Sequence, residues 1–435
     1  MKNIALENFL HIYTDFDNNE NTPLFTHSLD VAKVCVVIAD YLDVEYEKNF
    51  YFLAGLFHDI GLFIQNLSHD LIKKHNFRCE LTESSLYTFD ILKLLEQIDK
   101  KSIHSIISSK VMRFLNLNIP DIYFNVIKNS HKDLSKNSFE SEKEKILTEI
   151  LYVSDEISIF YRRNIKKGLG ITSKLIKEHL LKLNVSKDVM NGALSLLENI
   201  LFMNLCFDQK IHVEFFDQNL IFLNEDNMIN FSKLISFFID HRSPYTRNHT
   251  TYVAELSKIL GNELGSKEDS DILYMAGMYH DIGKIKTPLS ILHKKGVLNS
   301  EEFFIMKNHI VETYKFFKRS PELDFFGKYS YAHHERLDGS GYPFGKKENE
   351  LDMNHRIIAL ADVYSALIED RPYRKALESK DALKIIENEV NMKKLDFVVF
   401  QKLNELIKNG LILKTSDNII NYLFEEKKSF NNLIT

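Results

Sequence analysis

Histidine and aspartate residues in the second half of the chain have the types and order expected of a metal centre. They are His249, the pair His280-Asp281, His309, the pair His333-His334, and Asp362. Imidazole nitrogens and carboxylate oxygens together suit iron, manganese, zinc or related divalent ions, and the absence of thiolates disfavours a purely structural zinc site. Seven ligands exceed what one ion takes from protein while keeping positions open for water and substrate. We therefore predict a two-metal site with Asp281 as the shared carboxylate, an arrangement suited to phosphodiester hydrolysis.

Three cationic side chains follow these ligands in the sequence. Lys284 lies three residues beyond Asp281, where its ammonium group can contact a phosphate oxygen and stabilise developing charge. Arg371 and Arg374 follow Asp362 by nine and twelve residues across a proline, so the chain turns there and can direct two guanidinium groups at a second phosphate. The pattern predicts Asp281 and Lys284 as catalytic residues and a cyclic dinucleotide, which has two phosphates, as substrate.

The first half of the chain repeats part of this pattern. Leu53 to Gly61 resembles Met275 to Gly283, with identical Ala, Gly, His, Asp, Ile and Gly positions. A second histidine precedes each His-Asp pair by the same 31 residues, and an aspartate in an apolar helical run follows each pair. Matched landmarks in one order indicate two copies of one domain. The candidate metal ligands of the first copy are His27, His58, Asp59 and Asp155.

The elements that must position these residues are predicted to be helices. Runs rich in Leu, Ile and Phe carry apolar residues three and four apart, and the chain has only 7 prolines, so we expect an all-α fold. One exception is Ile211 to Leu223, where β-branched and aromatic residues around Asp217-Gln218-Asn219 predict a short hairpin. We divide the chain into a helical domain at 1–165, a connector of helices and the hairpin at 166–226, and a second domain with a C-terminal helical extension at 227–435.

Composition restricts the class of partner. A chain of 435 residues is too long for one compact core, and its net charge of -6 disfavours binding to polymeric nucleic acid. No stretch approaches the ~20 apolar residues of a membrane span, and the N-terminus lacks the pattern of a secretion signal. We expect a cytoplasmic protein with a small-molecule substrate, and a homodimer is one option for its assembly. Cys35, Cys79 and Cys206 are expected to be buried apolar residues without a disulfide.

Residues 227 to 415 resemble the HD-GYP family. The resemblance rests on His280-Asp281-Ile282-Gly283-Lys284, then His-His-Glu-Arg-Leu-Asp-Gly-Ser-Gly-Tyr-Pro at 333–343, then Asp362 with Arg371-Pro-Tyr-Arg374. It implies tandem HD-type helical bundles in which the seven residues named above bind metal, with iron or manganese as the usual ions. Lys284, Arg371 and Arg374 would contact the phosphates, and Gly341, Tyr342 and Pro343 would form a loop beside the site.

The activity implied by the resemblance is the opening of a cyclic dinucleotide to a linear one. Family members of this kind typically act on cyclic di-GMP, and some act on cyclic GMP-AMP. A catalytically silent receptor for such a nucleotide is the alternative. Tyr245 stands where some members carry a glutamate that helps to hold a third metal, so a two-metal centre is expected. Ser243 stands where many members have an aspartate, which leaves the base or ribose contacts open.

The first copy resembles the four-ligand set of the broader HD superfamily, which is sufficient for one divalent ion. It has Ser130-His131 in place of His333-His334 and Leu62 in place of Lys284, and the spacing of His104 does not match that of a third-helix ligand. Mononuclear sites of this superfamily commonly imply phosphomonoester chemistry. Two roles remain open: a phosphomonoesterase that trims the linear product, or a degenerate domain kept for regulation, packing, dimerisation or ligand sensing.

Overall fold

The structure is a computed structural model of the 435-residue chain. It describes residues 4–5, 24–62, 103–132, 134, 138–208, 215, 222–241, 249–265, 267–319, 321–370 and 374–410. These residues belong to two compact units, one ending at Asn230 and the other running on from Phe231. Helices account for every described element except two strands of two residues each, which confirms the prediction of an all-α fold.

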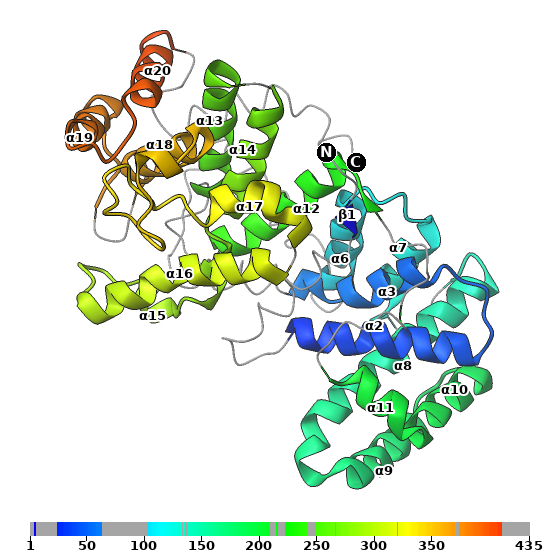
Figure 1. The fold of residues 1–435 in the computed structure, drawn as a ribbon. Coiled ribbons are helices and arrows are strands. Elements are labelled where there is room, and N and C mark those ends of the chain that lie inside the picture. The colour runs from blue at the N-terminus through cyan, green and yellow to red at the C-terminus, as the bar shows by residue number, and fades with distance from the viewer. Residues whose placement is uncertain are drawn as a thin grey trace. The chain divides into compact units, whose positions relative to one another are not determined.

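The first unit is built around five helices. They are α2 (Leu24–Tyr41), α3 (Lys48–Phe57), α6 (Ile103–Phe114), α7 (Asp121–Asn129) and α8 (Glu142–Asn164). Helix α2 packs against α3 and α8, and α7 packs against α3, α6 and α8; α2 and α3 lie side by side in blue in Figure 1. Apolar residues of α2, such as Val34 and Ile38, are fully buried against these neighbours. Burial of such side chains contributes most of the stability of a helix in a protein.

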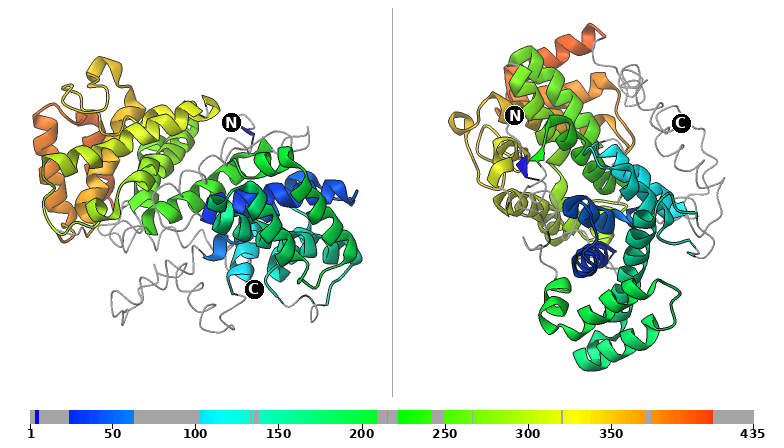
Figure 2. Two further views of the ribbon diagram at one scale, coloured as in Figure 1. Left: turned by 90° about the horizontal axis from the view of Figure 1, so that it is seen from below. Right: turned by 90° about the vertical axis from the view of Figure 1, so that its right-hand side faces the viewer.

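The second unit repeats this arrangement. Its helices are α12 (Glu225–His241), α13 (His249–Leu264), α14 (Lys267–Tyr279), α15 (Leu289–Leu292), α16 (Ser300–Arg319), α17 (Asp324–Ser330), α18 (Met353–Ile368), α19 (Ser379–Asn391) and α20 (Phe397–Lys408), with short 3-10 turns η5 (Ile282–Lys286), η6 (Pro321–Leu323) and η7 (Glu348–Glu350). Helix α12 begins in the first unit, before the division at residue 230. Helix α13 packs against α14 and α18 as α2 packs against α3 and α8. The orange and red helices α19 and α20 pack against α18 and, for α20, also against α13 (Figure 2).

The close approach of paired helices has the same cause in both units. A Cβ atom added to Gly55 would lie 2.6 Å from Cα of Ala32, and one added to Gly277 would lie 2.5 Å from Cα of Ala254. Only glycine fits where two helix backbones come this close. The repeated Ala-Gly of the sequence therefore fixes how the helix that ends at each His-Asp pair lies on its neighbour.

Connector helices pack on the first unit. Helix α9 (Leu169–Leu180), which follows the 3-10 turn η3 (Ile165–Lys167), contacts α8, while α10 (Lys187–Glu198) contacts α2 and α8 and α11 (Ile200–Cys206) contacts α2. No single helix among the described residues has the length and apolar character of a membrane span; α10 and α11 meet that test only as a pair bent by 94°. Cys35 and Cys206 are buried and free, whereas Cys79 lies outside the described residues.

The predicted hairpin is described only in part. Its last two residues form β2 (Phe222–Leu223), which pairs antiparallel with β1 (Ile4–Ala5), so that Ile4 faces Leu223. The described strand of this segment thus takes its partner from the start of the chain. Residues 209–214 and 216–221 lie outside the described residues.

Candidate metal centres

Helix ends and two helix interiors bring the seven predicted ligands of the second unit together. His249 begins α13, the His280-Asp281 pair directly follows α14, and the His333-His334 pair comes shortly after α17. His309 lies within α16 and Asp362 within α18. Six of the seven are buried, and His334 is half-buried. The seven residues form three overlapping groups, in each of which the ligand atoms lie within 4.8 Å of one another.

Asp281 has its two carboxylate oxygens directed at different histidines. Oδ2 lies 3.1 Å from Nε2 of His280 and 3.8 Å from Nε2 of His249, while Oδ1 lies 3.4 Å from Nε2 of His309. Asp362 lies across the cluster, with Oδ1 3.3 Å from Nε2 of His249. The two oxygens of Asp281 are thus available to two different groups of histidines.

Three histidines of the cluster are held in one tautomer by backbone carbonyls of the preceding turn. Nδ1 of His280, His309 and His333 each lies 2.6 Å from the backbone carbonyl oxygen three residues earlier. A carbonyl only accepts, so Nδ1 carries the proton and Nε2 presents its lone pair to the cluster. Within the described structure these three Nε2 atoms are buried and make no hydrogen bond. Orphaned buried nitrogens of this kind fit a bound divalent ion.

The electrostatics of the cluster favour the protonation states that a metal ion requires. Burial lowers the pKa of His309 to about 4 and that of His333 to about 3. Burial opposes ionisation of Asp281, but the charges of His280 and Lys284 hold its pKa well below its usual range. Burial likewise opposes ionisation of Asp362, but the hydrogen bond from His249 and the neighbouring His333 and His334 together hold its pKa well below its usual range. The imidazoles of His309 and His333 are therefore neutral at neutral pH, where they face ionised carboxylates.

Glu369 is a site residue that sequence reasoning missed. Its buried carboxylate lies 3.0 Å from Nδ1 of His249, on the side of the ring opposite the cluster. Such a carboxylate orients the ring of a metal-binding histidine and makes its other nitrogen a better donor. The available signal was weak: Glu369 follows Asp362 by seven residues and comes directly after the last residue of α18.

The structure describes two of the three residues predicted to contact phosphate, Lys284 and Arg374. The ammonium group of Lys284 pairs with Oδ2 of Asp281 at the edge of the cluster. The guanidinium of Arg374 donates to the carbonyls of Ala366 (2.6 Å) and Leu367 (2.8 Å), and so satisfies acceptors in the last turn of α18. Its phosphate contact stays a prediction, and Arg371 lies outside the described residues, as do Ser243 and Tyr245.

The Gly-Tyr-Pro loop lies against the cluster. The ring of Tyr342 lies 4.8 Å from that of His334, its amide donates to the carbonyl of His334, and the Tyr342-Pro343 bond is cis. A Cβ atom on Gly341 would lie 2.4 Å from the backbone nitrogen of Arg336, so only glycine fits there. Buried Glu335 accepts hydrogen bonds from the amides of Phe344 and Lys346 and so fixes the far side of the loop.

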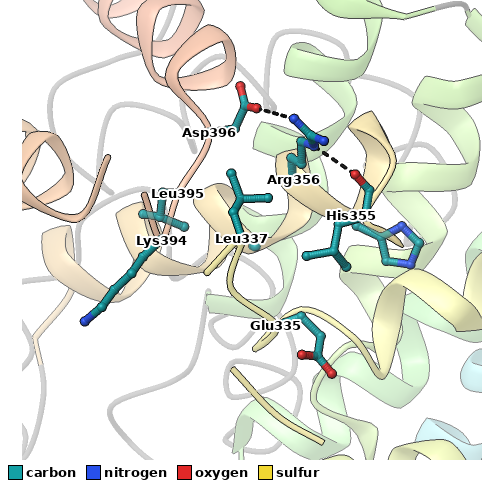
Figure 3. A pocket seen from close by; sticks show the side chains of 9 residues that line it. Glu335, Leu337, His355, Arg356, Lys394, Leu395 and Asp396 are labelled. Atoms are coloured by element: carbon teal, nitrogen blue, oxygen red, sulfur yellow. Dashed lines mark hydrogen bonds and ion pairs between the residues drawn. The ribbon is translucent and has the colours of Figure 1, made fainter. Parts of the chain in front are cut away.

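Glu335 also lines a small pocket. Leu337, Leu351, Lys394 and Leu395 line it beside Arg356, whose guanidinium lies 2.8 Å from a carboxylate oxygen of Asp396 (Figure 3). None of its lining residues is one of the seven ligands. The Arg356–Asp396 pair joins α18 to the start of α20 and so supports the helix that carries Asp362.

The four predicted ligands of the first unit also meet. His27 in α2, His58 and Asp59 after α3, and Asp155 in α8 are buried, and their ligand atoms lie within 4.8 Å of one another. Nε2 of His27 lies 3.0 Å from Oδ1 of Asp155. Burial opposes the charge on His58, yet Asp59 and Asp155 raise its pKa to about 9.

Two further histidines join this first cluster. Nε2 of His131 lies 3.0 Å, and Nε2 of His104 lies 3.5 Å, from Oδ1 of Asp59. Sequence comparison did not match His104 to a ligand because its spacing from the His-Asp pair differs between the two copies. The structure thus brings together six side chains that could hold a metal ion at the first site, two more than the sequence analysis assigned.

Comparison with known proteins identifies both units. Residues 24–159 match a family model described as HD domain, and residues 233–399 match a second model with the same description. The chain is a tandem HD-domain protein. The ligand order and the Gly-Tyr-Pro loop make the second HD domain one of the HD-GYP type, as the sequence predicted.

Relatives of this HD protein include named phosphodiesterases. The 3'3'-cGAMP-specific phosphodiesterase 1 of Vibrio cholerae is 38% identical over 191 residues, 43% of each chain. A cyclic di-GMP phosphodiesterase of Thermotoga maritima is 34% identical over 229 residues, which are 52% of this chain and 60% of the relative. The HD protein therefore spans about half the length of these curated relatives.

A solved structure shows the same fold over nearly the whole chain. The crystal structure of a cyclic GMP-AMP specific phosphodiesterase from V. cholerae aligns with a TM-score of 0.58 and 20% identity. The alignment covers 94% of this chain and 98% of that one. At this identity the likeness establishes the fold alone.

Proposed function

We propose that the second HD domain hydrolyses a cyclic dinucleotide, cyclic di-GMP or cyclic GMP-AMP, to a linear dinucleotide. The proposal rests on three buried imidazole Nε2 atoms without hydrogen bonds, together with Asp281, whose two carboxylate oxygens face different histidines. The names of the relatives supply the substrate class. A cytoplasmic location and a homodimer stay predictions.

Two divalent ions, iron or manganese, would be held by the seven ligands, with Asp281 shared between them. When bound, such ions supply a water activated for attack on phosphorus and positive charge for the phosphoryl oxygens. Glu369 keeps the ring of His249 in place. Lys284 keeps its ammonium group beside Asp281, where a phosphate oxygen of the substrate would accept from it as negative charge develops.

The Gly-Tyr-Pro loop would contact the nucleotide. Tyr342 offers an aromatic face beside His334, and the ammonium group of Lys307 lies 4.7 Å from its ring centre. An aromatic ring with a nearby cation suits a purine base next to a phosphate. Glu335 holds the loop in this position without reaching the cluster itself.

For the first HD domain we propose removal of the terminal phosphate from the linear product. Around Asp59, buried imidazoles such as His58 and His104 face carboxylates with ring nitrogens that make no hydrogen bond. A role in packing or dimerisation does not require such unsatisfied nitrogens, so the arrangement supports a catalytic role instead. Regulation of the second domain is the remaining alternative.

Product analysis tests both roles. Metal-loaded protein is incubated separately with cyclic di-GMP and cyclic GMP-AMP, beside His280→Ala, Asp281→Ala and Asp59→Ala variants. We expect a linear product that the first two changes abolish together with everything derived from it. We expect Asp59→Ala to leave that linear product and to remove only its further conversion to the dinucleotide without a terminal phosphate. If the metal-loaded protein binds a nucleotide and leaves it intact, the domain is a receptor; if linear product accumulates regardless of Asp59, the first domain is regulatory.

A further inference from the structure

Asp59 divides its two oxygens between two groups of histidines, as Asp281 does. Oδ2 lies 3.6 Å from Nε2 of His58 and 3.9 Å from Nε2 of His27. Oδ1 faces His131 and His104 instead, at 3.0 and 3.5 Å. The ligand atoms of Asp59, His104 and His131 lie within 4.8 Å of one another as a group separate from the four predicted ligands, with Asp59 as the shared member.

The position of His104 is built in the same way as that of His309. The amide of Gly61 donates to Oγ of Ser108 (2.9 Å), and the amide of Gly283 donates to Oγ1 of Thr313 (3.1 Å). Ser108 and Thr313 each lie four residues after the histidine. A Cβ atom on Gly61 would lie 2.0 Å from the carbonyl oxygen of His104, and one on Gly283 would lie 1.9 Å from that of His309. The two histidine helices therefore dock alike on the turn after each His-Asp pair.

His131 takes the place of His334. Its Nδ1 lies 3.9 Å from Oδ2 of Asp155, and Nδ1 of His334 lies 3.7 Å from Oδ2 of Asp362. Ser130, which stands in for His333, donates its hydroxyl to the carbonyl of Ile127 (2.8 Å). The second group of the first domain therefore keeps three of the four protein ligands found in its counterpart.

The ring nitrogen Nε2 of His104 gives the strongest indication of a bound ligand at this second group. His104 is buried, and in the described part of the chain this nitrogen makes no hydrogen bond while it points at Asp59. A buried imidazole nitrogen without a hydrogen bond is costly unless a ligand satisfies it. Two imidazoles and a carboxylate are a set that iron, manganese and zinc accept while keeping positions open for water or an anion.

We propose that the first HD domain binds two divalent metal ions, with a second ion held by Asp59, His104 and His131. Asp59 bridges this ion to the one held by His27, His58 and Asp155. The second ion has one protein ligand fewer than its counterpart at Asp281, His309, His333 and His334, so it is the more weakly bound. The proposal concerns metal content and does not depend on which reaction either domain catalyses.

The test counts metal ions per full-length chain by mass spectrometry after loading with Mn²⁺ and removal of free ion. Asp281→Ala and His333→Ala together form the background, because they remove the shared carboxylate and a histidine from the second domain. In this background and in the unmodified chain, we expect His104→Ala and His131→Ala each to release one ion. The matched control His179→Ala removes a histidine that pairs with Glu156 and stacks on Phe160, and it should release none.

Electron paramagnetic resonance of the Mn²⁺-loaded background keeps the proposal testable if a variant folds poorly. Two ions that share Asp59 give a spin-coupled signal, whereas a single ion gives the signal of isolated Mn²⁺. Coupling that disappears in His104→Ala supports the proposal. An uncoupled signal in the background chain, or unchanged metal content in both histidine variants, overturns it.

Discussion

Glu369 and His249 form a buried contact of 3.0 Å between a carboxylate oxygen and the ring nitrogen that faces away from the metal ligands. In the described part of the first domain a hydroxyl stands at this point: Nδ1 of His27 lies 2.9 Å from Oγ of Ser158, which in turn lies 3.4 Å from Asp30. The ring of His249 is thus oriented directly by a charged carboxylate, whereas the ring of His27 is oriented through the hydroxyl of Ser158.

Removing the charge of Glu369 should weaken metal binding without removing a ligand. Glu369→Gln keeps the size of the side chain but makes His249 a poorer donor, and we expect the affinity of the second domain for metal to fall by about tenfold to a hundredfold. A competition titration with a chelator measures this. Glu387→Gln, at an exposed position on α19, is the matched control. Equal affinities for the two variants would show that Glu369 does not orient the ligand.

Lys284 should act on the rate and leave the metal content intact. In Lys284→Met the ammonium group beside Asp281 is lost, and we expect kcat/KM for the cyclic dinucleotide to fall by about a hundredfold to a thousandfold. Lys286→Met is the control, since Lys286 pairs with Glu312 at 3.5 Å, away from Asp281. Steady-state kinetics with metal analysis of the same samples separates the effects. A loss of ions that matches the loss of rate would argue for a structural role.

Gly341→Ala should displace the Gly-Tyr-Pro loop. The new Cβ atom would meet backbone atoms of Arg336 and Glu335, which cannot yield as a flexible side chain can. We expect about 1 to 3 kcal/mol of destabilisation and a raised KM from the shift of Tyr342. Gly170→Ala in α9, where the added atom meets nothing within 4 Å, should leave both quantities unchanged or slightly raise stability. Kinetics and thermal melting test this pair, and similar behaviour of the two variants would count against the packing argument.

Acid should destabilise the metal-free second domain at pH values well above those at which carboxylates titrate. The pKa values of His309 and His333 are lowered to about 4 and about 3 in the fold, so below about pH 6.5 the unfolded chain binds protons that the folded chain does not. Stability therefore falls as the pH drops, by about 2 kcal/mol per imidazole at about pH 5. The depressed pKa values of Asp281 and Asp362 add their losses only at lower pH.

Urea unfolding of chelator-treated protein between about pH 7 and pH 5 measures this dependence. Asp30, with its pKa raised to about 6 chiefly by burial, has the opposite sign in the first domain and loses its contribution as the pH rises. His309→Asn and His333→Asn should flatten the pH dependence of the second domain, and His179→Ala should not. A dependence that is the same in all four proteins would rule out the two histidines as its origin.

The sequence by itself determined the fold class and the duplication, and it named the seven candidate ligands that the second domain brings together. The order of these residues in the sequence predicts that they meet, because each histidine lies at a helix end or on a helix face. The contacts of these helices are specified by the apolar period and by glycines such as Gly277. The spacing of His27 and His58 repeats for the same reason, since α2 and α3 pack as α13 and α14 do. The family resemblance followed from residues that lie in short, continuous motifs.

The tertiary structure alone decided the roles of residues whose partners are distant in the chain. His104 reaches Asp59 because Gly61 lets the backbone of α6 come into contact, and the number of residues between them does not influence that docking. Glu369 and Arg374 both follow Asp362 closely, yet one faces His249 and the other caps α18, since side-chain direction depends on where the helix ends. Spacing predicts which residues share an element, and only packing determines which of them meet.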